Sequence, residues 1–312
     1  MGTRGRARRP LLVVVLGAVL AAVLAGGAWA GAGPGAGRWQ ADASRLAAEP
    51  KRIISLVPAL TEMLFAIGAG PQVAAVSSYD DFPEEAASRP KVGALLDPDV
   101  ERIFSLSPDL VALYGSQTDL RRQLERASIR TYDYRHAGLA DVLTTLRDLG
   151  RVTGHMAEAE RVAESIEQRL TAVSARAATA RRVRTLLVFG REPGALRNVY
   201  VAGGRGFLHD MLVVAGGDNV FADVARESVQ ATTELILARA PEVVIELREG
   251  PTLTDEEVRT RVAEWARLAS VPAVKNGRVH ILSGTGLVVP GPRVAAAVER
   301  LADVLHPWRR AP

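Results

Sequence analysis

Glu101-Arg-Ile-Phe-Ser-Leu-Ser-Pro108-Asp109-Leu-Val111 and Glu234-Leu-Ile-Leu-Ala-Arg-Ala-Pro241-Glu242-Val-Val244 repeat one pattern 133 positions apart. In each stretch the first glutamate is followed by Ile after two residues, Pro after seven, a second acid after eight and Val after ten. Proline lacks the N–H that a helix needs, so each stretch predicts a short helix, then a proline, then an apolar strand. A chain that contains this unit twice is predicted to have two similar lobes, each presenting one glutamate at a matching place.

Strand and helix patterns alternate on both sides of the chain's middle. The strands that we predict are 53–57, 73–77, 110–113 and 129–132, and then 186–189, 199–202, 243–247 and 279–282. The helices that we predict between them are 61–67, 119–127, 207–214, 234–239, 256–268 and 293–305. Such alternation is typical of α/β folds with mainly parallel sheets.

The alternation stops in the middle, where apolar residues keep helical spacing over 139–149 and again over 156–180, with Gly154 between them. A helix of about 24 residues is about 36 Å long, comparable to the width of a domain. It is either a surface helix packed on the first lobe or a rigid connector between lobes. Its length and position favour the connector. We therefore predict two mainly parallel-sheet α/β lobes, residues 51–153 and 183–312, joined by one long α-helix within 154–182.

The N-terminus has the pattern of an export signal. Four arginines within residues 4–9 precede the apolar run Leu11–Ala25, and Ala28-Trp29-Ala30 fits a cleavage site. About 15 apolar residues fall short of the roughly 20 that span a bilayer, although an uncleaved membrane anchor is the alternative. We predict a signal peptide over 1–30, a flexible lead-in over 31–50 and a periplasmic or extracytoplasmic protein, with tethering as the alternative.

Charge and cysteine content exclude several classes of protein. The 312-residue chain carries a formal net charge of +4, which the four N-terminal arginines account for, so its basic character does not argue for nucleic-acid binding. There is no cysteine, which excludes disulfides, cysteine nucleophiles and lipid attachment through an N-terminal cysteine. No G-x-S-x-G, H-E-x-x-H or P-loop motif is present, and the five histidines lack metal-ligand spacing. We expect neither an enzyme nor a resident metal or cofactor.

The candidate ligand contacts are tyrosines and loop arginines. In open α/β sheets, ligands lie beyond the carboxyl ends of the strands, and tyrosine offers apolar area with a hydroxyl group. Arginines in loops can bind carboxylates or phosphates through forked hydrogen bonds. The predicted ligand-binding residues are Tyr79, Tyr114, Tyr134, Arg135, His136, Arg191, Tyr200, Arg205, Arg226 and Arg248. Gly203-Gly204-Arg205-Gly206 precedes a helix, and its amides are a candidate anion cradle.

Motifs in chain order support a family resemblance. They are Ile53–Glu62, Val76–Pro83, Pro90–Gly93, Glu101–Val111, Tyr200–Gly203, Ala215–Phe221 and Thr233–Pro241. Together they make residues 51–306 resemble the periplasmic solute-binding proteins of vitamin B12 and iron-siderophore ABC importers, the class III or helical-linker family, and most of all its cobalamin-binding members.

The resemblance implies a ligand between two lobes and delivery to a dimeric permease with its ATPase subunits. It implies that Glu101 and Glu234 meet basic residues of that permease, one in each half. The simpler explanation is that both glutamates only favour the start of their helices. We expect a monomer.

For the ligand, the resemblance favours a corrinoid, because Tyr79 and Tyr114 match aromatic corrin contacts. Corrinoid binders are expected to have aromatic residues at two places where this chain has none. These places are Leu95 and the loop Gly284–Val289. A ferric siderophore or haem is therefore an alternative ligand. The same pocket would also suit a sensor subunit of a receptor, and less so an enzyme that modifies chelates.

Overall fold

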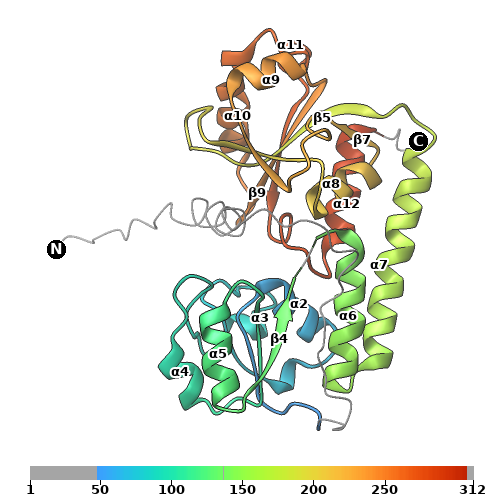
Figure 1. Ribbon diagram of the computed structural model, residues 1–312. Coiled ribbons are helices and arrows are strands. Elements are labelled where there is room, and N and C mark those ends of the chain that lie inside the picture. The colour runs from blue at the N-terminus through green and yellow to red at the C-terminus, as the bar shows by residue number, and fades with distance from the viewer. Residues whose placement is uncertain (1–47, 136, 308–312) are drawn as a thin grey trace, which may run out of the picture.

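The computed structural model describes residues 48–135 and 137–307. Two α/β lobes lie one above the other, and the long helix α7 (Met156–Ala177) runs along the side of both (Figure 1). The predicted signal segment, the lead-in up to residue 47 and His136 lie outside the described residues. Among the described residues, no helix is both long and apolar enough to cross a membrane.

The N-terminal lobe contains a parallel sheet of four strands in the order β2-β1-β3-β4. These strands are β1 (Ile53–Ser55), β2 (Val73–Val76), β3 (Leu110–Tyr114) and β4 (Arg130–Tyr134). Its helices are α2 (Pro58–Ala66), the 3-10 helix η1 (Gly70–Gln72), α3 (Glu84–Ala87), α4 (Val100–Ser105) and α5 (Thr118–Arg126). The central strand β1 is fully buried and has Ile53 and Ile54 in the cores on its two sides, which explains its continuous apolar sequence.

The C-terminal lobe has a larger and mixed sheet, in the order β10-β9-β5-β6-β8, with β7 paired to β5. These strands are β5 (Val183–Gly190), β6 (Val199–Ala202), β7 (Gly217–Asn219), β8 (Ser228–Ala231), β9 (Val243–Glu249) and β10 (Val279–Gly284). Its helices are α8 (Phe207–Val214), α9 (Thr233–Arg239), α10 (Asp255–Glu264), the 3-10 helix η2 (Trp265–Leu268), α11 (Pro272–Lys275) and α12 (Val294–Leu305). Strand β6 runs antiparallel to β5, and β8 antiparallel to β6. The sequence pattern did not predict β8.

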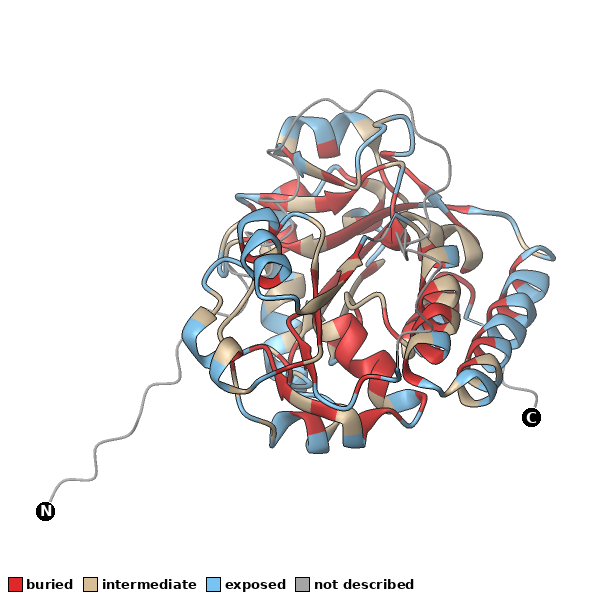
Figure 2. Cartoon of the chain, turned by 60° about the horizontal axis from the view of Figure 1, so that its bottom comes forward, coloured by how far each residue is buried: buried red, intermediate tan, exposed pale blue. Residues whose placement is uncertain are grey.

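One long helix, α7, connects the lobes and packs along α6 (Leu139–Thr153). Helix α6 ends at Gly154, whose φ of 81° is the left-handed conformation that glycine adopts most easily, and α7 starts two residues later. Arg147 of α6 pairs with Glu160 of α7 at 2.8 Å, and Arg169 of α7 pairs with Glu299 of α12 at 2.7 Å. One hydrophobic core runs from the first lobe through α6 and α7 into the second. Buried residues gather in the strands and on the inward helix faces (Figure 2). The predicted connector is confirmed.

The repeated unit has the same local structure in both lobes. Glu101 and Glu234 are each the second residue of a short helix, α4 or α9, whose N-cap side chain accepts a backbone N–H: Asp99 from Arg102 and Thr232 from Leu235. After each helix, the residue directly before the proline has a positive φ, Ser107 at 47° or Ala240 at 45°. The strand then begins two residues after the proline, at Leu110 or Val243.

The structure also adds a matching arginine to this unit. Arg52, next to β1, donates to the carbonyl of Leu106 at 2.7 Å, and Arg184 of β5 donates to the carbonyl of Arg239 at 2.6 Å. The acids after the prolines bond to the same segments, because the N–H of Asp109 donates to Arg52 and that of Glu242 to Arg184. These contacts hold α4 and α9 against the starts of equivalent central strands.

Candidate functional site

Two predicted tyrosines meet where strands of the N-terminal lobe end. Tyr114 and Tyr134 are the last residues of β3 and β4 and are directly paired in register. Their ring centroids are 5.9 Å apart, with the planes at 61°. Burial raises the pKa of both hydroxyls above the usual 10, so they stay neutral at physiological pH. The sheet therefore ends in an aromatic pair with uncharged polar groups, at the edge where α/β proteins place ligands.

A buried carboxyl group lies beside this pair, and the sequence analysis missed it. Asp80 is 1% exposed and accepts a hydrogen bond from the Ser77 hydroxyl. Burial raises its pKa to about 6, although hydrogen bonds from Ser77 and Thr61 and the charge of Lys91 oppose that rise. The predicted residue Tyr79 is its half-buried neighbour in sequence. The sequence signal for Asp80 is its place in the motif Val76–Pro83, from which only Tyr79 was predicted to contact ligand.

An ion pair that the sequence analysis also missed joins the lobes. Glu62 on α2 of the first lobe bonds the Arg293 guanidinium just before α12 of the second, with Nε to Oε2 at 2.8 Å. Glu62 is 5% exposed and Arg293 23%. Burial raises the pKa of Glu62; Arg293 opposes this rise and the nearby charge of Glu249 adds to it. The two residues are 231 positions apart, so no local pattern connects them.

A backbone contact also crosses between the lobes, at the start of α6. The N–H of Leu139 donates to the carboxylate of Asp210, in the first turn of α8, at 2.8 Å. Asp141 accepts the N–H groups of Ala137 and Gly138 at 3.0 and 2.7 Å. The segment that leaves β4 therefore enters α6 between carboxylates of both lobes.

Three of the predicted arginines remain exposed. Arg135, just past β4, packs over Gly115, where an added Cβ would come within 2.9 Å of its Nε. Arg205 and Arg226 are exposed beside the turn that precedes α8. Their backbones are joined, because the N–H of Arg205 donates to the carbonyl of Arg226 at 3.3 Å. All three side chains are open to solvent, and ligand contact by them stays a prediction.

Arg191 and Arg248 belong to a buried charge network within the C-terminal lobe. Arg191 is fully buried, bonds Glu246 of β9 at 2.8 Å and also pairs with Glu264. Glu246 is shared with Arg261 at 3.2 Å and with the indole N–H of Trp265 at 3.3 Å. Burial lowers the pKa of Arg248, and the charge of Arg261 adds to this. Arg191 is already occupied by carboxylates of its own lobe, so we leave it out of the proposed site.

Tyr200 and the glycine-rich loop show how the mixed sheet changes the expected geometry. Tyr200 is the second residue of β6 and lies opposite Gly190, the last residue of β5, so it still lies at the carboxyl edge of the parallel strands. Its ring is 6.4 Å from that of Phe189. The expected anion cradle at 203–206 is wrong: the amides of Gly203, Gly204 and Arg205 already donate to backbone carbonyls. A half-buried neighbour of this loop, Glu227, has its pKa raised by burial.

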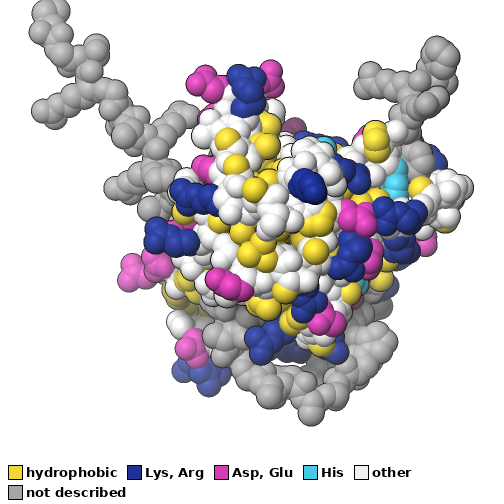
Figure 3. Space-filling view, turned by 90° about the horizontal axis from the view of Figure 1, so that it is seen from above, with side chains coloured by type: hydrophobic (Ala, Val, Ile, Leu, Met, Phe, Trp, Pro, Cys, Tyr) yellow, Lys and Arg dark blue, Asp and Glu magenta, His cyan; other side chains and the backbone are white. Residues whose placement is uncertain are grey.

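Glu101 and Glu234 are both exposed, as a docking role requires. Helices α4 and α9 lie in opposite lobes and away from α7 (Figure 1). Backbone and threonine hydrogen-bond donors at the start of α9 lower the pKa of Glu234. Leu235 and Leu237 beside it are 42% and 41% exposed. The end of the molecule seen from above shows charges of both signs among hydrophobic side chains (Figure 3).

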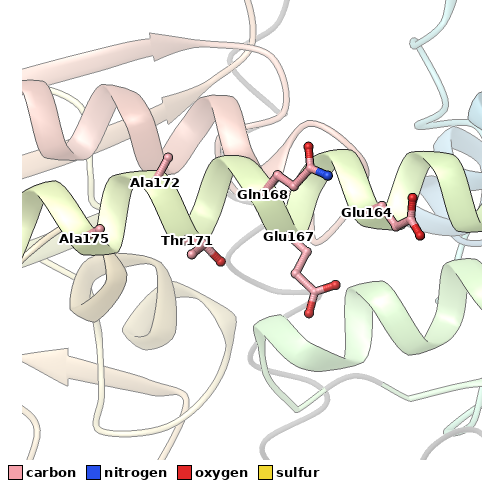
Figure 4. A pocket seen from close by; sticks show the side chains of 6 residues that line it. All are labelled: Glu164, Glu167, Gln168, Thr171, Ala172 and Ala175. Atoms are coloured by element: carbon pink, nitrogen blue, oxygen red, sulfur yellow. The ribbon is translucent and has the colours of Figure 1, made fainter.

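A surface pocket lies along α7 and contains none of the predicted ligand residues. Its described lining consists of Glu164, Glu167, Gln168, Thr171, Ala172 and Ala175. All six come from this one helix and are exposed (Figure 4). One helix face without an aromatic side chain does not enclose a large ligand, so we assign no ligand to it. In the described part of the chain, no cluster of three or more His, Cys, Asp or Glu side chains could hold a metal ion.

Known proteins resemble this chain in sequence over most of its length. A vitamin B12-binding protein of Vibrio parahaemolyticus is 28% identical over 268 residues, which are 85% of this chain and 93% of that protein. An uncharacterized ABC transporter substrate-binding lipoprotein of Bacillus subtilis, YvrC, is 29% identical over 268 residues, 83% of this chain and 81% of its own length.

Solved structures resemble it in fold. The periplasmic vitamin B12 binding protein BtuF of Vibrio cholerae has a TM-score of 0.70 at 24% identity, with 84% of this chain and 99% of that chain covered. The periplasmic heme-binding protein RhuT of Roseiflexus has a TM-score of 0.69 at 25% identity, with 82% and 98% covered. Similarity to BtuF at this level of identity supports the fold alone. The family model described as periplasmic binding protein matches residues 53–284, and the chain therefore belongs to the periplasmic binding protein family.

Proposed function

We propose that this protein captures a large, flat metal chelate, first of all a corrinoid, between its lobes and delivers it to the permease of an ABC importer. The observation that carries the ligand proposal is the Tyr114–Tyr134 pair at the carboxyl edge of the N-terminal sheet. Stacked or edge-on aromatic rings with neutral hydroxyls suit a broad apolar ligand that also carries polar groups. The sequence relative named as a vitamin B12-binding protein supports the same choice.

A ferric chelate, haem included, is the second candidate. Leu95 and the loop Gly284–Val289 add no aromatic ring, and the exposed Arg135, Arg205 and Arg226 suit the carboxylates of an anionic chelate. The structural neighbour named as a heme-binding protein supports this alternative. Catalysis is not proposed, because the family is one of binding proteins.

An absorbance titration with cyanocobalamin, hemin and a ferric siderophore tests the ligand proposal. We expect cyanocobalamin to bind with a dissociation constant between micromolar and nanomolar, about −8 to −12 kcal/mol. Tyr114→Leu should weaken binding about tenfold or more, because it removes one ring of the pair. Phe65→Leu is the matched control in the same lobe, since Phe65 packs by Gly70 and Arg89 rather than at the strand ends. Tight binding of hemin alone would select the second candidate.

We further propose that Glu101 and Glu234 are the contacts to the permease. The two carboxylates occupy equivalent positions in the two lobes, and a dimeric partner presents two equivalent surfaces. In vesicles containing the permease and its ATPase subunits, Glu101→Ala with Glu234→Ala should abolish ligand uptake and leave ligand affinity unchanged.

The control for the docking experiment is Glu85→Ala with Glu256→Ala. These glutamates are also exposed and in the first turns of helices, α3 and α10, but outside the repeated unit. The control should keep uptake normal. A loss of ligand affinity in the Glu101 and Glu234 variant would instead assign these acids to the ligand site or to the fold.

A further inference from the structure

A single connecting helix leaves the lobes some freedom to turn. Helix α7 is joined to α6 and α12 by ion pairs, but bending or rotation about its axis would change how the two sheets face each other. Such hinge motion is common where a few residues link two domains. A second attachment outside α7 would remove much of this freedom. The structure contains such an attachment, formed by Glu62 and Arg293.

This pair is the one side-chain ion pair that joins residues 48–135 with residues 183–307 in the described part of the chain. The contact has two parallel bonds, Nε to Oε2 at 2.8 Å and Nη2 to Oε1 at 2.5 Å, and this forked geometry fixes both direction and distance. A backbone contact, from Leu139 to Asp210, also crosses the lobes, but it lies at α6 and α8 and therefore beside the linker. The Glu62–Arg293 pair joins α2, which packs on α6, directly to the residue before α12.

Arg293 contacts the first lobe a second time, through Phe82. Its guanidinium carbon lies 3.9 Å from the centroid of this ring, in a cation–π contact. Phe82 follows β2, whereas Glu62 is on α2, so one arginine contacts two separate segments of the first lobe. Phe82 is 44% exposed. Two such contacts restrain rotation as well as separation of the lobes.

The second lobe holds Arg293 in a fixed place. Its Nη1 donates to the Thr285 hydroxyl at 2.7 Å. The loop that carries Thr285 is itself bound to Glu249 at the end of β9, which accepts the N–H groups of Leu287 at 2.9 Å and Val288 at 3.1 Å. Gly286 has a φ of 81°, and an added Cβ there would lie 2.5 Å from the Arg293 guanidinium carbon. Glycine is therefore required where the arginine crosses the loop.

Stability does not explain why such a pair is present. The pKa of Glu62 is raised rather than lowered, because the cost of burial exceeds the gain from Arg293 and because Glu249 adds a second negative charge nearby. Buried ion pairs often contribute little net stability, since desolvation offsets the attraction, and their better-supported role is to select one arrangement. Here the arrangement is the placement of one lobe against the other.

We propose that Glu62 and Arg293 are positioning residues whose ion pair tethers the two lobes apart from α7, fixes their separation and thereby restricts the thickness of the ligand that binds between them. The part about the ligand rests on the proposed function, whereas the tether itself does not. A chelate that fits the fixed separation binds without a cost for reorganising the lobes.

Distances between two spin labels test the tether in the ligand-free protein. The chain has no cysteine, so Gln123→Cys on exposed α5 and Ser270→Cys after η2 give one unique label in each lobe. We expect a narrow distance distribution in the parent and one that broadens at least about twofold in Arg293→Met and in Glu62→Gln. Arg121→Met is the matched control, because Arg121 is about as exposed as Arg293 and pairs with Asp133 at 2.8 Å within one lobe.

The outcomes are separable. A distribution in Arg293→Met and Glu62→Gln as narrow as that of the parent and of Arg121→Met overturns the tether. Circular dichroism checks folding, and if Arg293→Met does not fold, Glu62→Gln decides the matter, because it removes the charge and keeps the side-chain volume.

Titration of the same variants then tests selection by thickness. We expect Arg293→Met to bind cyanocobalamin about tenfold more weakly. Most of this loss should appear as a smaller ratio between the affinities for cyanocobalamin and hemin. Unchanged discrimination alongside a broadened distance distribution would reject the selective role and keep the tether. If the parent itself binds none of the chelates, the proposed function fails, and the label distances still decide whether the lobes are tethered.

Discussion

Both lobes bury several hydroxyl groups, but their buried charged groups differ. The N-terminal lobe buries the carboxyl groups of Asp80, which accepts from the Ser77 hydroxyl, and of Glu62, whose partner Arg293 belongs to the other lobe. In the second, Arg191 and Glu246 are both buried at 2.8 Å from each other, and Glu246 also holds Arg261.

The internal repeat of the two lobes is confined to a short unit. The helix, proline and strand recur in both lobes because they perform one local task, which is to end a helix and start a strand beside the central one. The two sheets differ in size and direction, with four parallel strands in one and six mixed strands in the other. The strands outside the common unit are therefore arranged differently in the two lobes.

Arg191→Met gives the largest expected difference between the lobes. The change leaves Glu246 buried with fewer partners, so unfolding free energy should fall by about 3–5 kcal/mol. The corresponding N-terminal change, Arg121→Met, breaks a more exposed pair and should cost about 0–1 kcal/mol. Urea denaturation followed by circular dichroism and by the fluorescence of buried Trp265 measures both. Equal losses of unfolding free energy would show that the two ion pairs do not differ in what their removal costs.

Asp80→Asn tests the neutral character of the N-terminal site. Burial raises the pKa of Asp80 from 3.8 to about 6, so between these values the folded protein binds more protons than the unfolded chain. Its stability should therefore fall as the pH rises from 4 to 6, by about 3 kcal/mol at most, and level off above. Asp80→Asn should remove this dependence and be more stable than the parent at pH 7.

Denaturation curves at pH 4.5 and 7 measure that effect. The contribution of Asp80 is the difference between parent and variant, because Glu62 and Glu227 also have raised pKa values and act in the same direction. A parent that loses stability relative to the variant as the pH falls would contradict the assignment.

Asp99→Ala and Thr232→Ala give the smallest expected difference. Each side chain caps the helix of one repeated unit by accepting one backbone N–H. Loss of an N-cap costs about 1 kcal/mol, and we expect the two losses to agree within about 0.5 kcal/mol. Paired urea denaturation of the two variants checks this. A clearly larger loss of unfolding free energy in one lobe would mean that the common unit contributes unequally to the stability of the two lobes.

Much of the architecture could be predicted from the sequence because its signals are local. Pro108 and Pro241 each follow a short helix, because proline is disfavoured inside a helix, Gly154 adopts a left-handed turn readily, and the apolar spacing of 156–180 is that of one helix face. The connector ends at Ala177, three residues earlier than predicted. The positions of Tyr114 and Tyr134 could also be predicted from the sequence, because both lie where adjacent parallel strands end.

Other features depended on contacts between distant parts of the chain. The pairing of Glu62 with Arg293, the occupation of Arg191 by Glu246 and the reversed direction of β6 and β8 come from residues that meet only after folding. The sequence pattern indicated that Arg191 is a free loop arginine and that the amides of residues 203–206 are free donors. Both have partners in the folded protein, and the sequence does not reveal which groups will meet there.

The sequence alone determined the two α/β lobes and the connecting helix, since each rests on propensity and spacing within about 25 residues, and it matched Glu101 with Glu234 through the repeat 133 positions apart. The tertiary structure decided which charges are buried, which are free and how the lobes are held together. The physical reason is that desolvation and ion pairing depend on distances between atoms, and these are set only when both lobes pack.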